Sequence, residues 1–188
     1  MNLLLPLLLS HFIADFPLQN NKIVGLKHQK IYGVLLHALI HLAVMSAILF
    51  PFFQVQRVWI GVLTVFLAHV IIDHAKVYLD SRYPHWHPLY LYFGDQFFHL
   101  LTIFLVTYFW IGQVHLAPET ITYYMGNPIA LYLLVAILAT YFYDVTRWFW
   151  KNEGRAKKQH YPYRRDYRMM LRNLLLITAI FGVIWWVF

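Results

Sequence analysis

Four pairs of histidine or aspartate side chains recur at a spacing of four residues inside strongly apolar stretches of the sequence. The pairs are His11 with Asp15, His37 with His41, His69 with Asp73, and Asp95 with His99. Residues four apart lie on the same face of an α-helix. Imidazole and carboxylate groups bind divalent transition metals and also form proton relays in membranes. Because such groups are costly to bury without partners, the pairs predict a shared polar centre.

The composition predicts a membrane protein. Of the 188 residues, 61% are hydrophobic and only 12% are charged, whereas apolar residues make up about half of an ordinary soluble domain. The formal net charge of +7 does not indicate nucleic-acid binding, because membrane proteins gather Lys and Arg in their cytoplasmic loops for topological reasons. The chain has no cysteine, which excludes disulfides and thiolate ligands. Any metal must therefore be bound by nitrogen and oxygen atoms.

Six apolar stretches predict helices that could cross a bilayer. They are 3–19, 31–50, 58–79, 89–111, 128–150 and 169–188. Each has about 16 to 23 residues and ends at charged residues or at Pro and Gly, which is typical of membrane spans. Residues 20–30, between the first two stretches, are expected to form a loop. The predicted fold class is all-α, a polytopic membrane helix bundle with about six transmembrane helices.

The Lys and Arg residues predict the orientation of these helices. They concentrate in the first, third and fifth connections, so the positive-inside rule places those connections in the cytoplasm and both termini on the opposite side. The basic loop 151–168 is explained by topology, and it could also bind anionic lipid headgroups. We expect one integral membrane domain over 1–188, with a His- and Asp-bearing four-helix core in 1–112 and two scaffold helices in 113–188.

The same topology predicts that the four pairs meet at a common depth. With a rise of 1.5 Å per residue, one layer of side chains lies about 6 to 9 Å from the cytoplasmic helix ends and a second at about 12 to 15 Å. The first layer comprises Asp15, His37, Asp73 and Asp95, and the second comprises His11, His41, His69 and His99. The order of His and Asp inverts between descending and ascending helices, so the depth stays the same.

Metal binding is the first interpretation of this centre. The candidate ligands are His11, Asp15, His41, His69, Asp73, Asp95 and His99. Seven donors exceed the four that a tetrahedral ion needs, so we expect one or two divalent transition-metal ions, with zinc the leading choice. Four further residues are candidates for orienting the ligands: Gln19, His37, Lys76 and Gln96. Of these, His37 is also a candidate ligand. Lys76 is expected either to extend to the membrane interface or to neutralise Asp73, which lies one turn before it.

The leading functional hypothesis is a metal-dependent hydrolase that acts within the membrane. A bound ion would lower the pKa of water and polarise an ester, amide or phosphoryl oxygen. Asp15 or Asp95 would be the catalytic general base, because Asp73 has Lys76 close by. An opening on the cytoplasmic side would suit a lipid or lipid-linked substrate whose anionic headgroup meets the basic loop.

Two other classes of function use the same residues. A transporter of metal ions or protons would use the cluster as a relay, although the six stretches show no evident repeat of comparable halves. A non-catalytic membrane partner protein would use its polar core to fix the register of its helices. Metal content and transport in liposomes distinguish these classes.

Three motifs carry a resemblance to a known family. They are His11-Phe-Ile-Ala-Asp15-Phe-Pro-Leu-Gln19 with Lys22 soon after, His69-x-x-x-Asp73-x-x-Lys76, and Asp95-Gln96-x-x-His99. Together they resemble the bacterial membrane family called domain of unknown function 3307, over about the first 110 residues. The resemblance implies a helical fold in the bacterial inner membrane and no established substrate. More distantly, the spacing looks like that of bacterial membrane proteins known as metal-dependent hydrolases, which is an analogy and adds modest support for an enzyme.

Overall fold

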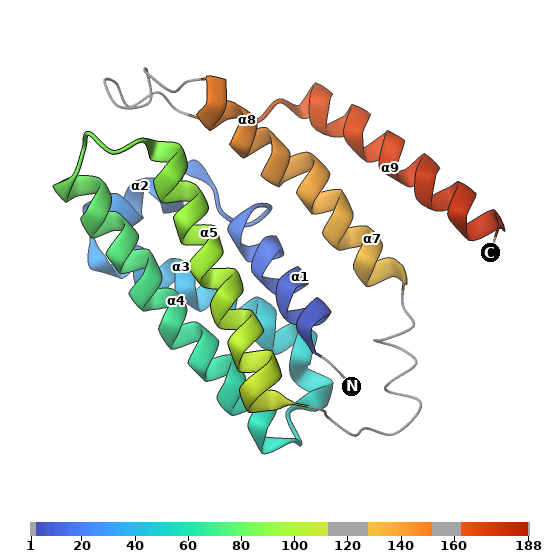
Figure 1. The fold of residues 1–188 in the computed structure, drawn as a ribbon, viewed down its shortest axis with the longest axis horizontal. Helices are drawn as coiled ribbons and strands as arrows, with labels where there is room; N and C mark the ends of the chain where they lie inside the picture. The colour runs from blue at the N-terminus through green and yellow to red at the C-terminus, as the bar shows by residue number, and fades with distance from the viewer. Residues whose placement is uncertain (1–2, 113–127, 152–162, 188) are drawn as a thin grey trace.

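The computed structural model describes residues 3–112, 128–151 and 163–187. All regular elements in these ranges are helical, which confirms the predicted all-α bundle (Figure 1). The elements are α1 (Leu4–Asp15), α2 (Asn21–Gln29), α3 (Ile31–Leu49), η1 (Phe50–Phe52), α4 (Gln56–Arg82), α5 (Pro88–Leu105), η2 (Val106–Ile111), α7 (Pro128–Ile137), η3 (Leu138–Phe142), α8 (Tyr143–Lys151) and α9 (Tyr167–Val187). The segments η2 and η3 are π-helical and continue α5 and α7 without a break in direction.

Four helices form a closed group in which each contacts two others. Helix α1 packs against α3 and α5, and α4 packs against α3 and α5 from the other side. Helix α7 packs against α1, and α9 packs against α7 along one flank (Figure 1). Helices α1, α3, α4 and α5 are the ones that carry the His and Asp pairs. The core of the bundle is therefore the place where those pairs can meet.

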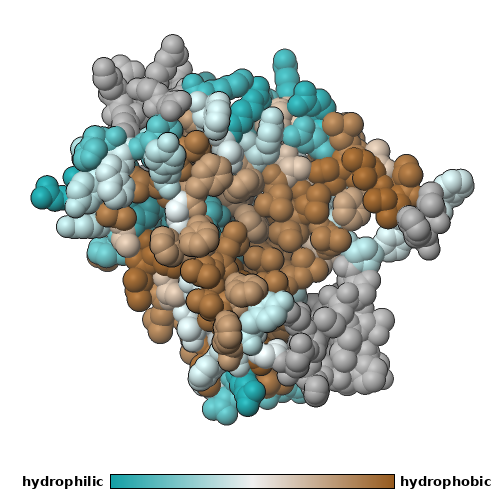
Figure 2. All heavy atoms as spheres, in the orientation of Figure 1, coloured by the Kyte–Doolittle hydropathy of each residue, from teal (hydrophilic) through white to brown (hydrophobic). Residues whose placement is uncertain are grey.

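Five helical segments are long and apolar enough to cross a membrane, which indicates a membrane protein. They are Ile31–Phe52, Gln56–Arg82, Pro88–Ile111, Pro128–Lys151 and Tyr167–Trp186. Figure 2 shows apolar side chains across the middle of the visible face and hydrophilic ones toward its top and bottom. The first predicted span is shorter than expected, since α1 has 12 residues and a length of about 18 Å against about 30 Å for a bilayer core.

Residues 20–30, predicted as a loop, instead contain the helix α2. The side chain of Asn20 accepts hydrogen bonds from two backbone N–H groups of the first turn, which is the geometry of a helix N-cap. At Gly33 in α3, an added Cβ would lie 2.3 Å from the backbone carbon of Leu26 in α2. Only glycine allows this approach. The close packing brings Lys27, which is buried, against the core of the bundle.

The two ends of the four-helix group differ in their buried residues. At the end remote from α2, the core is apolar. It consists of Leu3, Leu7, Met45, Leu49, Phe52, Val58, Val62, Val65, Ile103, Val106 and Ile111. The end near α2 holds the buried His and Asp residues. A second apolar cluster, which includes Phe12, Phe16 and Leu134, joins α1 to α7.

Candidate metal centre

The structure brings the four predicted pairs into one buried cluster. Each of the eight side chains belongs to a residue that is at most 9% exposed. The imidazole rings are close neighbours, with ring centroids 3.8 Å apart for His41 and His69 and 4.0 Å apart for His69 and His99. His11 lies 5.2 Å from His41 by the same measure. Four helices thus contribute to one centre, as their amphipathic spacing predicted.

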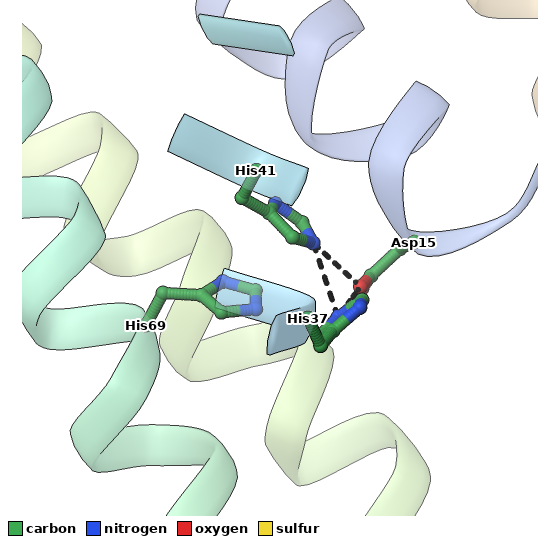
Figure 3. A group of neighbouring side chains, drawn as sticks. All are labelled: Asp15, His37, His41 and His69. Atoms are coloured by element: carbon green, nitrogen blue, oxygen red, sulfur yellow. Dashed lines mark hydrogen bonds and ion pairs between the residues drawn. The ribbon is translucent and has the colours of Figure 1, made fainter. Parts of the chain in front are cut away.

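Three donor atoms of this cluster form a tight triangle (Figure 3). The Nε2 atoms of His37 and His41 each lie 3.0 Å from Oδ1 of Asp15, and they lie 3.1 Å from each other. If both imidazoles donate to Asp15, their N–H groups face each other with no acceptor between them. If one accepts from the other, it no longer donates to Asp15. Hydrogen bonds alone therefore cannot satisfy all three contacts.

A divalent cation would satisfy all three contacts of this triangle. Ligands around a tetrahedral zinc ion, with bonds of about 2.0 to 2.1 Å, are separated from one another by about 3.3 to 3.4 Å. The observed separations of 3.0 to 3.1 Å are within a few tenths of an ångström of that spacing. His69 completes a set of four donors that lie within 4.8 Å of one another. We name Asp15, His37, His41 and His69 the first ligand group.

His69, Asp73 and His99 form the second ligand group, whose donor atoms also lie within 4.8 Å of one another. The Nε2 atom of His69 is 3.4 Å from Oδ2 of Asp73, and that of His99 is 3.3 Å from Oδ1 of Asp95. Within the described part of the chain, these two Nε2 atoms, Oδ2 of Asp73 and Oδ1 of Asp95 make no hydrogen bond, although Oδ2 of Asp73 forms an ion pair with Lys27. Most buried polar atoms in proteins have a hydrogen-bond partner. The second group could therefore accept a further ligand.

Gln96 and His11 hold the other oxygen of Asp15. The Nε2 atom of Gln96 donates to Oδ2 of Asp15 at 2.7 Å. The Nε2 atom of His11 lies 3.4 Å from that oxygen and 3.4 Å from Oε1 of Gln96. Oδ1 of Asp15 is thereby left to face the two α3 imidazoles. Gln96 thus lies where it can orient the carboxylate of Asp15, as its predicted role requires.

His11 and His37 lie on different oxygens of Asp15. His37, for which the sequence left ligand and orienting residue open, belongs to the first ligand group. His11, a predicted metal ligand, has its Nε2 atom 3.4 Å from Oδ2 of Asp15 and belongs to neither ligand group. The reason is that the two oxygens of Asp15 face opposite sides, which the spacing within α1 does not reveal. Gln19 lies 3.2 and 3.3 Å from the two ring nitrogens of His37 and so lies against its ring.

Two lysines pair with the remaining carboxylates. Lys27 Nζ lies 2.7 Å from Oδ2 of Asp73, and Lys76 Nζ lies 2.8 Å from Oδ2 of Asp95. Lys76 pairs with Asp95, and not with Asp73 as one of its two predicted roles required, because its side chain crosses from α4 to α5. Lys27 is not identified from the sequence, because residues 20–30 are predicted as a loop. The N-cap residue Asn20 was the signal in the sequence that indicated a helix there.

The donor set suits a divalent transition metal. Imidazole nitrogens dominate it and carboxylate oxygens add negative charge, which is a combination typical of zinc, iron, copper and nickel sites. Helix pairs that place ligands four residues apart in a bundle core are a known way to build such centres. The described residues therefore contain a buried His and Asp cluster that could hold a metal ion.

Comparisons with known proteins give one result. A model of the family described as "Protein of unknown function (DUF3307)" matches residues 3–126, which include all eight residues of the four pairs. No curated protein matches significantly. No solved structure does either. The match extends over about two thirds of the chain and confirms the resemblance that the motifs carried, so the chain belongs to the DUF3307 family.

Proposed function

We propose that this protein is a membrane-embedded, metal-dependent hydrolase whose ion is held by the first ligand group. The observation that supports the proposal is the triangle of Asp15, His37 and His41, whose contacts hydrogen bonds cannot all satisfy. Zinc is the metal we expect from these nitrogen and oxygen donors; a hydrolytic zinc ion would use three of the four and keep one position for water. Such an ion would lower the pKa of that water and polarise the oxygen of a scissile bond.

Asp95 is the carboxylate we assign as general base. Asp15 is used as a ligand, and Asp73 has Lys27 on the oxygen nearest His69. Asp95 keeps one oxygen, Oδ1, without a hydrogen bond among the described residues, while Lys76 holds the other. A general base must reach the proton that it removes with a free lone pair. Oδ1 of Asp95 has Nε2 of His99 at 3.3 Å and no ammonium group on it, so it is the oxygen that we assign to this task.

The substrate we expect is a lipid or a lipid-linked molecule with an anionic headgroup. The helix ends nearest the centre carry many cationic side chains. Those on exposed described residues are Lys22, Lys30, Arg82, Lys151, Arg164 and Arg168; the rest of the basic loop lies outside the described residues. By the positive-inside rule this end faces the cytoplasm of a bacterial cell, with the protein in the inner membrane and both termini on the other side. Anionic headgroups would meet these cations at the membrane surface.

Transport of metal ions or protons is the alternative, and the apolar half of the bundle counts against it. The apolar core, which includes Leu3, Phe52 and Val58, fills the four-helix group between the His and Asp cluster and the far end of the helices. Of the buried polar residues described there, Thr107 donates its hydroxyl to Ile103 O of its own helix. A transport path needs polar partners along its whole length. This half offers no continuous chain of them among the described residues.

Metal analysis of purified protein tests the proposal. Wild-type protein in detergent should contain bound metal, and His41→Ala should lose it because His41 is one corner of the triangle on which the proposed site depends. His74→Ala is the matched control, because His74 lies on α4 near the centre but is exposed. The metal-loaded protein should hydrolyse ester or phosphoester lipids in vesicles, and Asp95→Asn should retain metal but lose this activity. Absence of metal from the wild type, or metal flux through wild-type liposomes, would overturn the proposal.

A further inference from the structure

We infer that the centre binds a single divalent ion and that the ammonium groups of Lys27 and Lys76 take the place of a second one. The inference rests on the proposed metal centre and specifies its composition. Two ligand groups that share His69 would ordinarily suggest a two-metal site. The charges and contacts of the two lysines instead favour one ion.

The charge balance of the buried cluster favours one ion. Its three carboxylates, Asp15, Asp73 and Asp95, together with the ammonium groups of buried Lys27 and half-buried Lys76, have a net charge of −1 when the histidines are neutral. One divalent ion brings the net charge to +1, and two ions bring it to +3. Uncompensated charge is very costly to bury in the interior of a bundle. The net charge of +1 is instead balanced by one anionic ligand from outside, such as a phosphate or carboxylate group of a substrate.

The contacts of Lys27 agree with this balance. Its Nζ atom lies 2.7 Å from Oδ2 of Asp73. The same carboxylate oxygen lies 3.4 Å from Nε2 of His69 and 3.8 Å from Nε2 of His37. The other oxygen of Asp73, Oδ1, lies 3.7 Å from Nε2 of His99, so Oδ2 is the oxygen that a second ion between Asp73 and His69 would use. Helix α2, which carries Lys27, packs closely on α3 at Gly33. Removing Lys27 from Asp73 by a movement of α2 would break this packing. The ammonium group therefore lies on the oxygen that a second ion would use.

Lys76 pairs with Asp95 in the same way, and no lysine among the described residues forms an ion pair with Asp15. Lys76 Nζ donates to Oδ2 of Asp95 at 2.8 Å. The contacts of Asp15 in the described part of the chain come from histidines and from Gln96. Of the three carboxylates, only the one in the first ligand group is thus without an ammonium partner there. A divalent ion binds in that group, and the second group is left for water or for the anionic ligand.

The stoichiometry of metal binding in the intact protein tests the inference. Detergent-solubilised wild type, stripped of metal and titrated with Co²⁺, should reach a plateau in visible absorption at one equivalent. Elemental analysis after loading with Zn²⁺ should give the same value. Two equivalents in the wild type would overturn the inference while leaving the proposed metal centre intact. No bound metal would overturn the metal centre and this inference with it.

A pair of double variants tests the role of the lysines. Lys27→Met with Lys76→Met changes the net charge of the cluster to −3, so two ions then give the same +1 that one ion gives in the wild type. We expect this variant to bind two equivalents of Co²⁺. Lys22→Met with Lys30→Met is the matched control, because both lysines are exposed near α2, and it should bind one. A single equivalent in the first variant would overturn the inference, and the wild-type titration decides the question if that variant does not fold.

Discussion

Asp73 and Lys27 form a buried ion pair that links α4 to α2. Their side chains are 1% and 8% exposed, and the two charged atoms are 2.7 Å apart. Taking either charge out of water is costly, and the pair is tolerated because each partner compensates the other. The contribution of Lys27 to stability therefore depends on the presence of Asp73.

Lys27→Met should destabilise the metal-free protein by about 3 to 5 kcal/mol, because it leaves a buried carboxylate without its cation. Adding Asp73→Asn should recover a large part of that loss, because the remaining group is neutral. Thermal unfolding in detergent, with metal removed by a chelator, measures both effects. If the double variant is as unstable as Lys27→Met, the pairing argument is wrong.

Gln96 contacts Asp15 without belonging to either ligand group. It fixes Oδ2 of Asp15 through a hydrogen bond of 2.7 Å, which directs Oδ1 toward His37 and His41. Loss of such a partner of a metal ligand typically costs 10- to 100-fold in metal affinity. Gln96→Leu should therefore weaken Zn²⁺ binding by about 10- to 100-fold without changing its stoichiometry. Gln54→Leu is the control, since Gln54 is exposed at the far end of the bundle; equal affinities for the two variants would contradict the assignment.

At the scale of the elements, the segment before α9 holds the end of α1. The Nη2 atom of Arg165 donates to Phe16 O at 3.0 Å and to Gln19 O at 3.1 Å, and its guanidinium lies over the ring of Tyr141. These carbonyls lie one and four residues after Asp15. The segment that connects the last two membrane helices thus supplies a residue that holds the chain next to the His and Asp cluster.

Arg165→Met should lower stability by about 1.5 to 3 kcal/mol, the range for hydrogen bonds to a charged group. It should also weaken metal binding, because the turn after Asp15 is no longer held. Arg168→Met, which changes an exposed cation on the first turn of α9, should have neither effect. Unfolding temperature and Co²⁺ affinity measured on both variants check the prediction. A change in stability with unaltered metal affinity would limit Arg165 to a structural role.

Much of this arrangement follows from the sequence, and the rest depends on contacts between helices. Spacing within one helix fixes which residues share a face, so the pair His69 and Asp73 could be recognised directly. Spacing does not fix the partner on another helix, and for that reason Lys76 was assigned to Asp73 and not to Asp95. The contact of Arg165 with the end of α1 could not be predicted either, because the positive-inside rule alone accounts for a cationic residue in that loop.

At the scale of the whole molecule, the bundle has one polar and one apolar half. The His and Asp cluster lies near α2 and the basic helix ends, whereas the other end is filled by the apolar core. Helix α1 begins at the apolar end, and α9 starts beside Arg165 and runs toward that end (Figure 1). The orientation of the protein in the membrane thus decides from which side the centre is reached.

Cysteine labelling can establish that orientation, because the chain has no cysteine of its own. Lys22 at the α2 end and Gln54 at the apolar end are both exposed, so either can be replaced singly. In spheroplasts of a bacterial host, a membrane-impermeant maleimide should label Gln54→Cys at once and Lys22→Cys only after the membrane is permeabilised. This result follows from the cations at the α2 end, which the positive-inside rule assigns to the cytoplasm. The opposite labelling pattern would place the metal centre near the outer face and exclude a substrate that approaches from the cytoplasm.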